Sequence, residues 1–288
     1  MTVIFEVRGG IGKVIASTAI LKTIRERHPD DDIVVVSPYP TVFNNNPYLD
    51  YNYYNNDMDA IYYVHIEGKK VKYYVQDPYF TDGFMNREMD LISSWHQLYD
   101  AYHIQKSQPQ LYLADYEIES AKALYKTDKP IFLLHTHGGN DTYSYNWAKD
   151  LPDCVIKEII DKYKDDYTIY HIKESKQPTY EHTKAATEDI RMIAGLIHMS
   201  KKRLFIDSFA QHMAKALYKR STVCWIATSP KNFGYDFHNN ILCNAYDFKT
   251  TANHYQQYGL REDRNNLPFA GEERIFDVDE IITSINLQ

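Results

Sequence analysis

Residues 2–40, TVIFEVRGGIGKVIASTAILKTIRERHPDDDIVVVSPYP, decide the fold class. The run from Thr2 to Val7 is short and rich in β-branched residues, which is typical of a buried parallel strand. A glycine-rich break follows, and the next segment carries apolar residues at helical spacing until Pro29 stops it. Residues 32–40 then form a second apolar, strand-like run. A strand–helix–strand unit of this kind predicts a parallel sheet in an α/β protein.

The same alternation of strand and helix patterns restarts at Ile131 and continues through the second half of the chain. We therefore expect an α/β protein of two doubly wound, Rossmann-like domains that face each other across a cleft. The first domain would comprise residues 1–128 and the second residues 129–288, which include a C-terminal helix within VDEIITSINL. That last helix could pack on either domain.

The segment between the two series has a less regular pattern. Residues 59–66 and 69–76 are expected to form short strands, because they are rich in tyrosine, valine and isoleucine. Residues 87–104 and 115–126 carry apolar residues at helical spacing, and this pattern predicts two helices.

The composition is that of an ordinary globular protein, with 44% hydrophobic and 25% charged residues. The net charge of −7 gives no general attraction to nucleic acids or membranes. The cysteines, Cys154, Cys224 and Cys243, are widely spaced, and we expect buried thiols rather than a zinc site. A secretory leader and a long apolar run are not recognisable, so we expect a cytoplasmic protein with no membrane span.

The glycine turn after the first strand fits neither of the two common phosphate-loop patterns. A Walker A loop would need glycine at Val7 and serine or threonine at Val14. A dinucleotide fingerprint begins correctly with Gly10 and Gly12, but Ile15 stands where the third glycine belongs. These mismatches argue against a P-loop NTPase and against a dinucleotide-dependent enzyme.

The turn nevertheless has the features of an anion site. Gly10 and Gly12 would let a ligand approach the backbone, and free N–H groups at a helix start favour a negative charge. Lys13 adds a mobile cation. The alternative is a tight turn followed by a solvated lysine.

A second cluster lies in FIDSFAQHMAKAL, residues 205–217. Asp207 and Ser208 end a predicted strand, and either side chain could cap the helix that follows. His212 lies near the first turn of that helix, within reach of the same pocket.

Four segments in the same order resemble glycosyltransferase family 9, the bacterial heptosyltransferase-like enzymes of the GT-B fold. They are GGIGKVIASTAILKTIRERHPDDDIVVVS, VFNNNPYLD, NWAKDLP and the block from Ile193 to Pro230, of which the last is the most specific. The resemblance spans most of the chain and is weakest at residues 50–125.

The resemblance implies an inverting transfer of a sugar from a nucleoside-diphosphate sugar, with no metal and no other cofactor. Asp207 would contact the nucleotide sugar or hold the loop, and Ser208 with nearby N–H groups would hold phosphate oxygens. The residues assigned to the donor are Gly10, Gly12, Gly138, Tyr145, Asp207, Ser208 and His212.

Three positions depart from the family pattern. The family places an aspartate, its general base, where this chain has Lys13, and a protonated lysine cannot accept a proton. The family's phosphate-binding lysine is replaced by Tyr145, and Lys13 could supply the missing cation from across the cleft. Phe209 replaces a glycine of the donor block.

The catalytic candidates are therefore Lys13 and His137. Other candidates for the base are His135 in the second domain, and His65, His96 or Asp77 in the first. Histidine suits this role near neutral pH. His135 and His137 could instead chelate a metal together with a neighbouring acid.

The acceptor could be a saccharide, as in the family at large, or a modified base in viral DNA. A nucleotide-sugar-binding protein without catalysis is a second possibility, because Lys13 occupies the position of the base. A third is another nucleotide-dependent enzyme of this fold, such as an epimerase. The sequence leaves the sugar, the nucleotide and the oligomeric state open.

Overall fold

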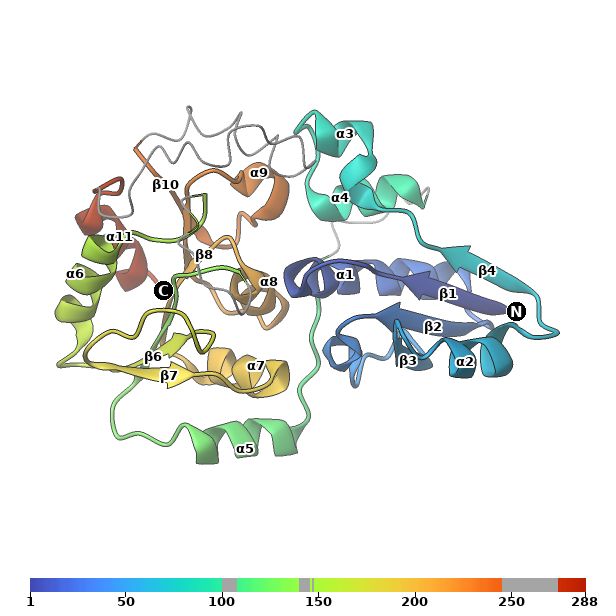
Figure 1. Ribbon diagram of the computed structural model, residues 1–288, viewed down its shortest axis with the longest axis horizontal. Coiled ribbons are helices and arrows are strands. Elements are labelled where there is room, and N and C mark those ends of the chain that lie inside the picture. Colours follow the sequence, from blue (N-terminus) through green and yellow to red (C-terminus); the bar gives the residue numbers. More distant parts are fainter. Residues whose placement is uncertain (100–107, 140–145, 147, 245–273) are drawn as a thin grey trace. The chain divides into compact units, whose positions relative to one another are not determined.

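The computed structural model describes residues 1–99, 108–139, 146, 148–244 and 274–288. The chain forms two compact units, Met1–Asp115 and Tyr116–Gln288. Each unit contains one parallel β-sheet accompanied by helices (Figure 1). The expected α/β fold with two Rossmann-like units is confirmed.

The first unit is built on four strands in the order β3-β2-β1-β4. They are β1 (Thr2–Glu6), β2 (Asp32–Ser37), β3 (Tyr51–Tyr54) and β4 (Val71–Tyr74), each parallel to its neighbours. Helix α1 (Ile11–Arg27) joins β1 to β2, and it is buried along most of its length. The predicted strand–helix–strand unit is therefore confirmed.

Residues 59–66 are helical, so the strand expected there is wrong. Helix α2 (Met58–Ile61) continues into a π-helical turn, η2 (Tyr62–Ile66). The buried side chains of this stretch are Ile61 and His65, four positions apart, whereas the tyrosines between them are exposed. Residues four apart share one face of a helix, whereas in a strand Tyr63 would share the buried face of Ile61 and His65, and its side chain is exposed.

The remaining elements of the first unit are short. They are η1 (Pro40–Phe43), η3 (Pro78–Phe80), α3 (Asp82–Met85) and α4 (Leu91–Leu98). The helix expected from residue 87 begins later because the carboxylate of Asp90 accepts the N–H groups of Ile92 and Ser93, which caps α4. Residues 100–104 of that prediction lie outside the described part of the chain.

The second unit is built on six parallel strands in the order β10-β9-β8-β5-β6-β7. They are β5 (Ile131–His135), β6 (Thr168–Ile172), β7 (Thr183–Ala186), β8 (Lys202–Ile206), β9 (Thr222–Trp225) and β10 (Asn239–Leu242). The chain runs outward from β5 to one edge and then from β8 to the other. The direction therefore reverses between β5 and β8, and ligands of open α/β sheets bind at the carboxyl ends of such strands.

The helices of this unit are α5 (Asp115–Leu124, whose first residue closes the other unit), α6 (Asp153–Tyr163), α7 (Ile190–Met199), α8 (Phe209–Ala216), α9 (Pro230–Phe233) and α11 (Val278–Asn286). Helix α11 packs within the second unit, where Ser284 bonds Thr222 at 2.7 Å and Asn286 accepts from the Tyr163 hydroxyl at 3.0 Å. Its apolar side joins the core made by β5, β6, β8 and α6.

Helix α5 also packs within the second unit. Glu117 receives two hydrogen bonds of 2.6 Å from the buried guanidinium of Arg191 on α7. Beside this pair, Ala121 lies against Gly195, where an added Cβ would approach the alanine Cβ to 2.5 Å. The boundary between the compact units therefore falls between residues 115 and 116 of the chain. The domain limits of 1–128 and 129–288 stay a prediction.

Among the described residues, no helix combines the length and the apolar character needed to cross a membrane.

Candidate functional site

The glycine turn shapes the first unit's candidate site. Gly9 has φ = +106°, a conformation that side chains rarely adopt, and Gly10 is the N-cap of α1. The stem of Lys13 folds back over this turn, and a Cβ added to Gly9 would lie 3.3 Å from its Cδ. Gly12 lies in the first turn of α1. The turn therefore directs the lysine side chain as well as starting the helix.

Lys13 is buried and ion-paired. Its Nζ lies 2.6 Å from Oδ2 of Asp77, which follows β4, and 4.4 Å from the centre of the Tyr79 ring. Burial lowers the pKa of Lys13, while the hydrogen bond and the charge of Asp77 oppose this shift. The alternative of a tight turn followed by a solvated lysine is therefore wrong, because the side chain of Lys13 is buried and paired.

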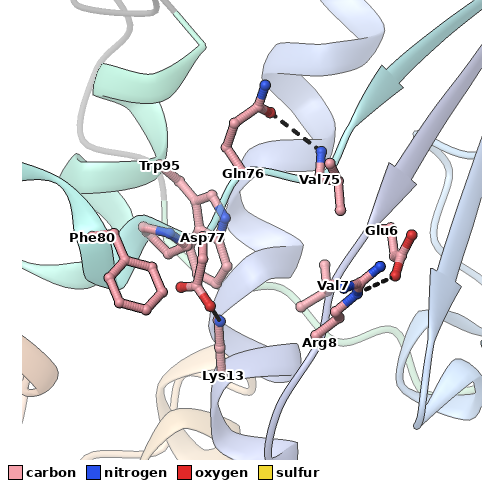
Figure 2. Close-up of a pocket in the computed structure, with 10 residues that line it drawn as sticks. Glu6, Val7, Arg8, Lys13, Val75, Gln76, Asp77, Phe80 and Trp95 are labelled. Carbon is pink, nitrogen blue, oxygen red and sulfur yellow. Dashed lines mark hydrogen bonds and ion pairs between the residues drawn. The ribbon is translucent and has the colours of Figure 1, made fainter. Parts of the chain in front are cut away.

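The pair lies in the wall of a pocket of 220 Å³ (Figure 2). The pocket is lined by Glu6, Val7, Arg8, Lys13, Val75, Gln76, Asp77, Pro78, Phe80 and Trp95. Figure 2 shows the exposed ring of Phe80 beside Asp77, and the Glu6–Arg8 pair on the other side of the view. Glu6 also accepts the hydroxyl of Tyr73, whose pKa burial and Glu6 raise to about 12. The pocket combines two paired carboxylates with one exposed aromatic ring.

The two histidines proposed as bases in this unit lie away from the pocket lining. His65 is on the π-helical turn, and its Nε2 lies 3.0 Å from the hydroxyl of Tyr53. His96 is buried on α4. Burial lowers the pKa of both rings. Of the three alternative bases named for this unit, Asp77 is the one that lines the pocket with Lys13.

In the second unit, the carboxyl ends of β5 and β8 are joined by a hydrogen bond. Nδ1 of His135 lies 2.7 Å from Oγ of Ser208. Ser208 is the N-cap of α8, but its side chain makes no hydrogen bond to the helix, so the capping role expected for this hydroxyl is wrong. The hydroxyl bonds His135 instead. Phe209, the first residue of α8, packs its ring 4.9 Å from that of His135.

Asp207 is buried and paired with Lys149. Its Oδ2 lies 2.9 Å from Nζ, and the side chain of Asp207 is 5% exposed against 31% for Lys149. Burial by itself would raise the pKa of Asp207, but the charge of Lys149, its hydrogen bond and a bond from Thr228 together lower it. A partly exposed cation therefore stands at the carboxyl end of β8.

His212 lies one turn along α8 and is buried. Its Nδ1 lies 2.8 Å from the hydroxyl of Tyr235. Burial lowers the pKa of His212 to about 4, with Asp207 opposing the shift, so the ring is neutral at neutral pH. Asp207, Ser208 and His212 lie around the start of one helix, while their contact with a donor stays a prediction.

His137 follows β5 and is fully buried. Its Nδ1 lies 2.9 Å from Oγ1 of Thr136, and its ring stacks on Tyr180, whose hydroxyl lies 3.4 Å from Nε2. Burial lowers its pKa to about 4. Its catalytic role stays a prediction, and the enclosed ring suits a neutral hydrogen-bonding partner. Across the described part of the chain, no group of three or more potential metal ligands gathers around His135 and His137.

Asp150 organises the loop between β5 and α6. Its carboxylate accepts the N–H groups of Gly138 at 2.8 Å and Asn146 at 2.9 Å, and burial raises its pKa to about 7. The N–H of Gly138 thus already has a protein acceptor. Tyr145 lies outside the described residues. Sequence reasoning missed Lys149 and Asp150, although both stand in the segment NWAKDLP that carries part of the family resemblance.

Comparisons with known proteins bear on the fold. Neither a protein-family model nor a curated protein sequence matches the chain. Among solved structures, a glycosyltransferase family 9 protein from Veillonella parvula matches with a TM-score of 0.70 at 11% identity, over 99% of this chain and 96% of its own. The ADP-heptose LPS heptosyltransferase II of E. coli gives 0.61 at 13% identity, over 90% and 98%. The E. coli heptosyltransferase WaaC, solved with ADP, gives 0.58 at 13% identity, over 90% and 99%. The chain thus has the GT-B-like fold of these proteins.

Proposed function

We propose that this protein is a glycosyltransferase that moves a sugar from a nucleoside-diphosphate sugar to an acceptor hydroxyl, with inversion and without a metal. The Lys149–Asp207 pair carries the proposal, because it presents a cation between the carboxyl ends of β5 and β8. That is the edge at which open α/β sheets bind nucleotides. The fold shared with a family 9 glycosyltransferase, with an ADP-heptose heptosyltransferase and with a heptosyltransferase solved with ADP supports it.

The donor would lie at the start of α8 in the second unit. Departure of a nucleoside diphosphate builds negative charge on a phosphate oxygen, and fixed donors and cations stabilise that charge. Lys149 would supply the cation, and the first N–H groups of α8 would supply hydrogen bonds. Asp207 would hold the lysine in place, while Ser208 and His212 would line the site as neutral groups.

Lys149 can also supply the phosphate-binding positive charge that is missing because Tyr145 stands where the family has a lysine. It lies in the same unit as Asp207 and needs no contribution from Lys13, which is bonded to Asp77. We therefore assign the phosphate-binding cation to Lys149. The hypothesis that Lys13 replaces it stays a second option for the same charge.

The acceptor would be a saccharide. The pocket of the first unit, at 220 Å³, is smaller than the about 300–1,000 Å³ that drug-sized ligands occupy, which suits a single ring. The net charge of −7 disfavours a DNA acceptor. A binding protein without catalysis is the second candidate, because Lys13 rather than a carboxylate follows the glycine turn.

Thermal-shift and calorimetric titrations with ADP, UDP, GDP and their hexose derivatives test the donor site, since a ligand of the native state raises its stability. We expect binding by at least one of them, and a loss of about 10-fold or more in Lys149→Ala, as for a lost charge-assisted bond. The exposed Lys157 on α6 provides the matched control, Lys157→Ala. Equal affinity in wild type and Lys149→Ala would remove the lysine from the site, and binding of none of the nucleotides would refute the function.

A further inference from the structure

We propose that Asp77 is the general base of the transfer and that Lys13 is its positioning residue. The inference rests on the proposed function and names the proton acceptor within it. The two side chains form one ion pair in the pocket wall, with Nζ and Oδ2 2.6 Å apart.

Exposure distinguishes the partners. The side chain of Lys13 is 7% exposed and that of Asp77 is 32% exposed, so the carboxylate is the member that an incoming ligand can reach. Lys13 is enclosed by the Tyr79 ring and the glycine turn. The ammonium of Lys13 bonds the carboxylate of Asp77, and the lysine cannot accept a proton while it is charged.

Asp77 is oriented but retains capacity to accept. Oδ1 takes the backbone N–H of Tyr79 at 3.0 Å and Oδ2 takes Lys13. An ionised carboxylate offers about four lone-pair sites, so two remain for an acceptor hydroxyl. Two fixed bonds, one to the backbone and one to a buried cation, hold the carboxylate in a single orientation, as a general base requires.

Glu6, the other carboxylate of the pocket, is less suited to the role. Its side chain is 10% exposed, and both Arg8 and the hydroxyl of Tyr73 bond to it. The exposed ring of Phe80 stands beside Asp77 instead, where its face could pack against the apolar side of a sugar ring. The pocket thus places an aromatic surface next to the accessible carboxylate.

The step balances without a further reactant. The acceptor hydroxyl oxygen forms a bond to the anomeric carbon, and the bond from that carbon to the phosphate oxygen breaks. The electron pair leaves with the nucleoside diphosphate. The hydroxyl proton moves to the carboxylate of Asp77, which later returns it to water, while Lys13 keeps its charge throughout.

Release of nucleoside diphosphate from ADP-, UDP- and GDP-hexoses, with water as the acceptor, tests the assignment in the full chain. Asp77→Asn keeps an oxygen for the Tyr79 N–H, and we expect kcat to fall by about 10²–10⁴-fold with the donor KM within about twofold. The exposed Asp82 gives the control, Asp82→Asn, with kcat unchanged. A small carboxylate should replace the missing base, so formate should restore Asp77→Ala at least tenfold and leave wild type unchanged.

The exchange variant Lys13→Asp/Asp77→Lys covers the case in which a single substitution destabilises the unit, because it keeps the ion pair. It also moves the carboxylate to the enclosed position 13, so we expect it to unfold at a urea concentration near that of the wild type and yet to lose kcat as Asp77→Asn does. Full activity in Asp77→Asn would overturn the assignment while leaving the transferase intact. The same conclusion would follow if Glu6→Gln lost as much activity as Asp77→Asn and formate failed to restore Asp77→Ala. A wild-type protein that binds and cleaves none of the donors would overturn the proposed function itself.

Discussion

Removal of the Lys149 side chain should destabilise the protein in a way that depends on pH. Lys149→Ala leaves the carboxylate of Asp207, which is 5% exposed, without its cation. Breaking a buried pair in this way costs about 3–5 kcal/mol. Because the side chain of Lys149 is itself 31% exposed, water can partly solvate the carboxylate of Asp207 in the variant. We therefore expect the unfolding free energy to fall by about 2–3 kcal/mol at pH 7.

The sign of the pH dependence follows from the shift of Asp207. In the wild type its folded pKa is lowered, so the pair stabilises the protein above the unfolded carboxyl pKa, and this contribution disappears as the pH falls through the folded value. In Lys149→Ala, burial is the largest remaining influence and raises the pKa of Asp207. The folded variant then takes up a proton more readily than the unfolded chain, and its deficit should shrink as the pH is lowered from 7 toward about 4.

Urea unfolding followed by tryptophan fluorescence at several pH values measures this deficit. Lys157→Ala removes an exposed lysine of the same unit whose nearest carboxylate is 3.9 Å away, and it should change the unfolding free energy by less than about 0.5 kcal/mol. A deficit in Lys149→Ala that is equal at pH 7 and at pH 4 would refute the reasoning, because it would show that an uncompensated carboxylate is not the cause.

Two further predictions concern the glycine turn and the thiols. Gly9→Ala should lower the unfolding free energy, measured in urea, by about 1–3 kcal/mol, because φ at this position is +106° and the new Cβ would contact the side chain of Lys13. Gly10→Ala has open space around its new Cβ and should lower the unfolding free energy by less than about 1 kcal/mol. Equal effects would contradict the turn geometry. Burial raises the pKa of the Cys224 thiol, so a thiol reagent should modify the half-buried Cys154 first and Cys224 only after unfolding; early labelling of Cys224 would contradict its enclosure.

The first strand–helix–strand unit was predictable because β1 and β2 are buried and mostly apolar, and because α1 carries its apolar residues at helical spacing. The strand expected within residues 69–76 is found as the edge strand β4, but the signal was missing at the other three sheet edges. Strands β3, β7 and β10 are only partly buried, and their sequences show neither an apolar run nor a clear alternation. Residues 59–66 contain many strand-forming side chains, but the three residues between the buried Ile61 and His65 are all exposed, which fits a helix and not a strand.

The positions of the candidate site residues in the chain were predictable, but the residues that they contact were not. The segments that follow strands were the expected positions. Asp207 and Ser208 lie between β8 and α8, and Lys13 lies in the first turn of α1. Their partners are 58 to 73 residues distant in the chain, as Lys149, Asp77 and His135 illustrate. Local patterns carry no information on which charges meet, because those contacts depend on the register of the whole sheet.

The central claim is that the protein cleaves a nucleoside-diphosphate sugar, and release of the nucleoside diphosphate tests it most directly. The purified full chain would be incubated with ADP-, UDP- and GDP-hexoses, and the free nucleoside diphosphate and the configuration of the released sugar would be measured. We predict release from at least one donor with inversion at the anomeric carbon, and its loss in Lys149→Ala but not in Lys157→Ala. Release from none of these donors, or equal release by both variants, would contradict the account.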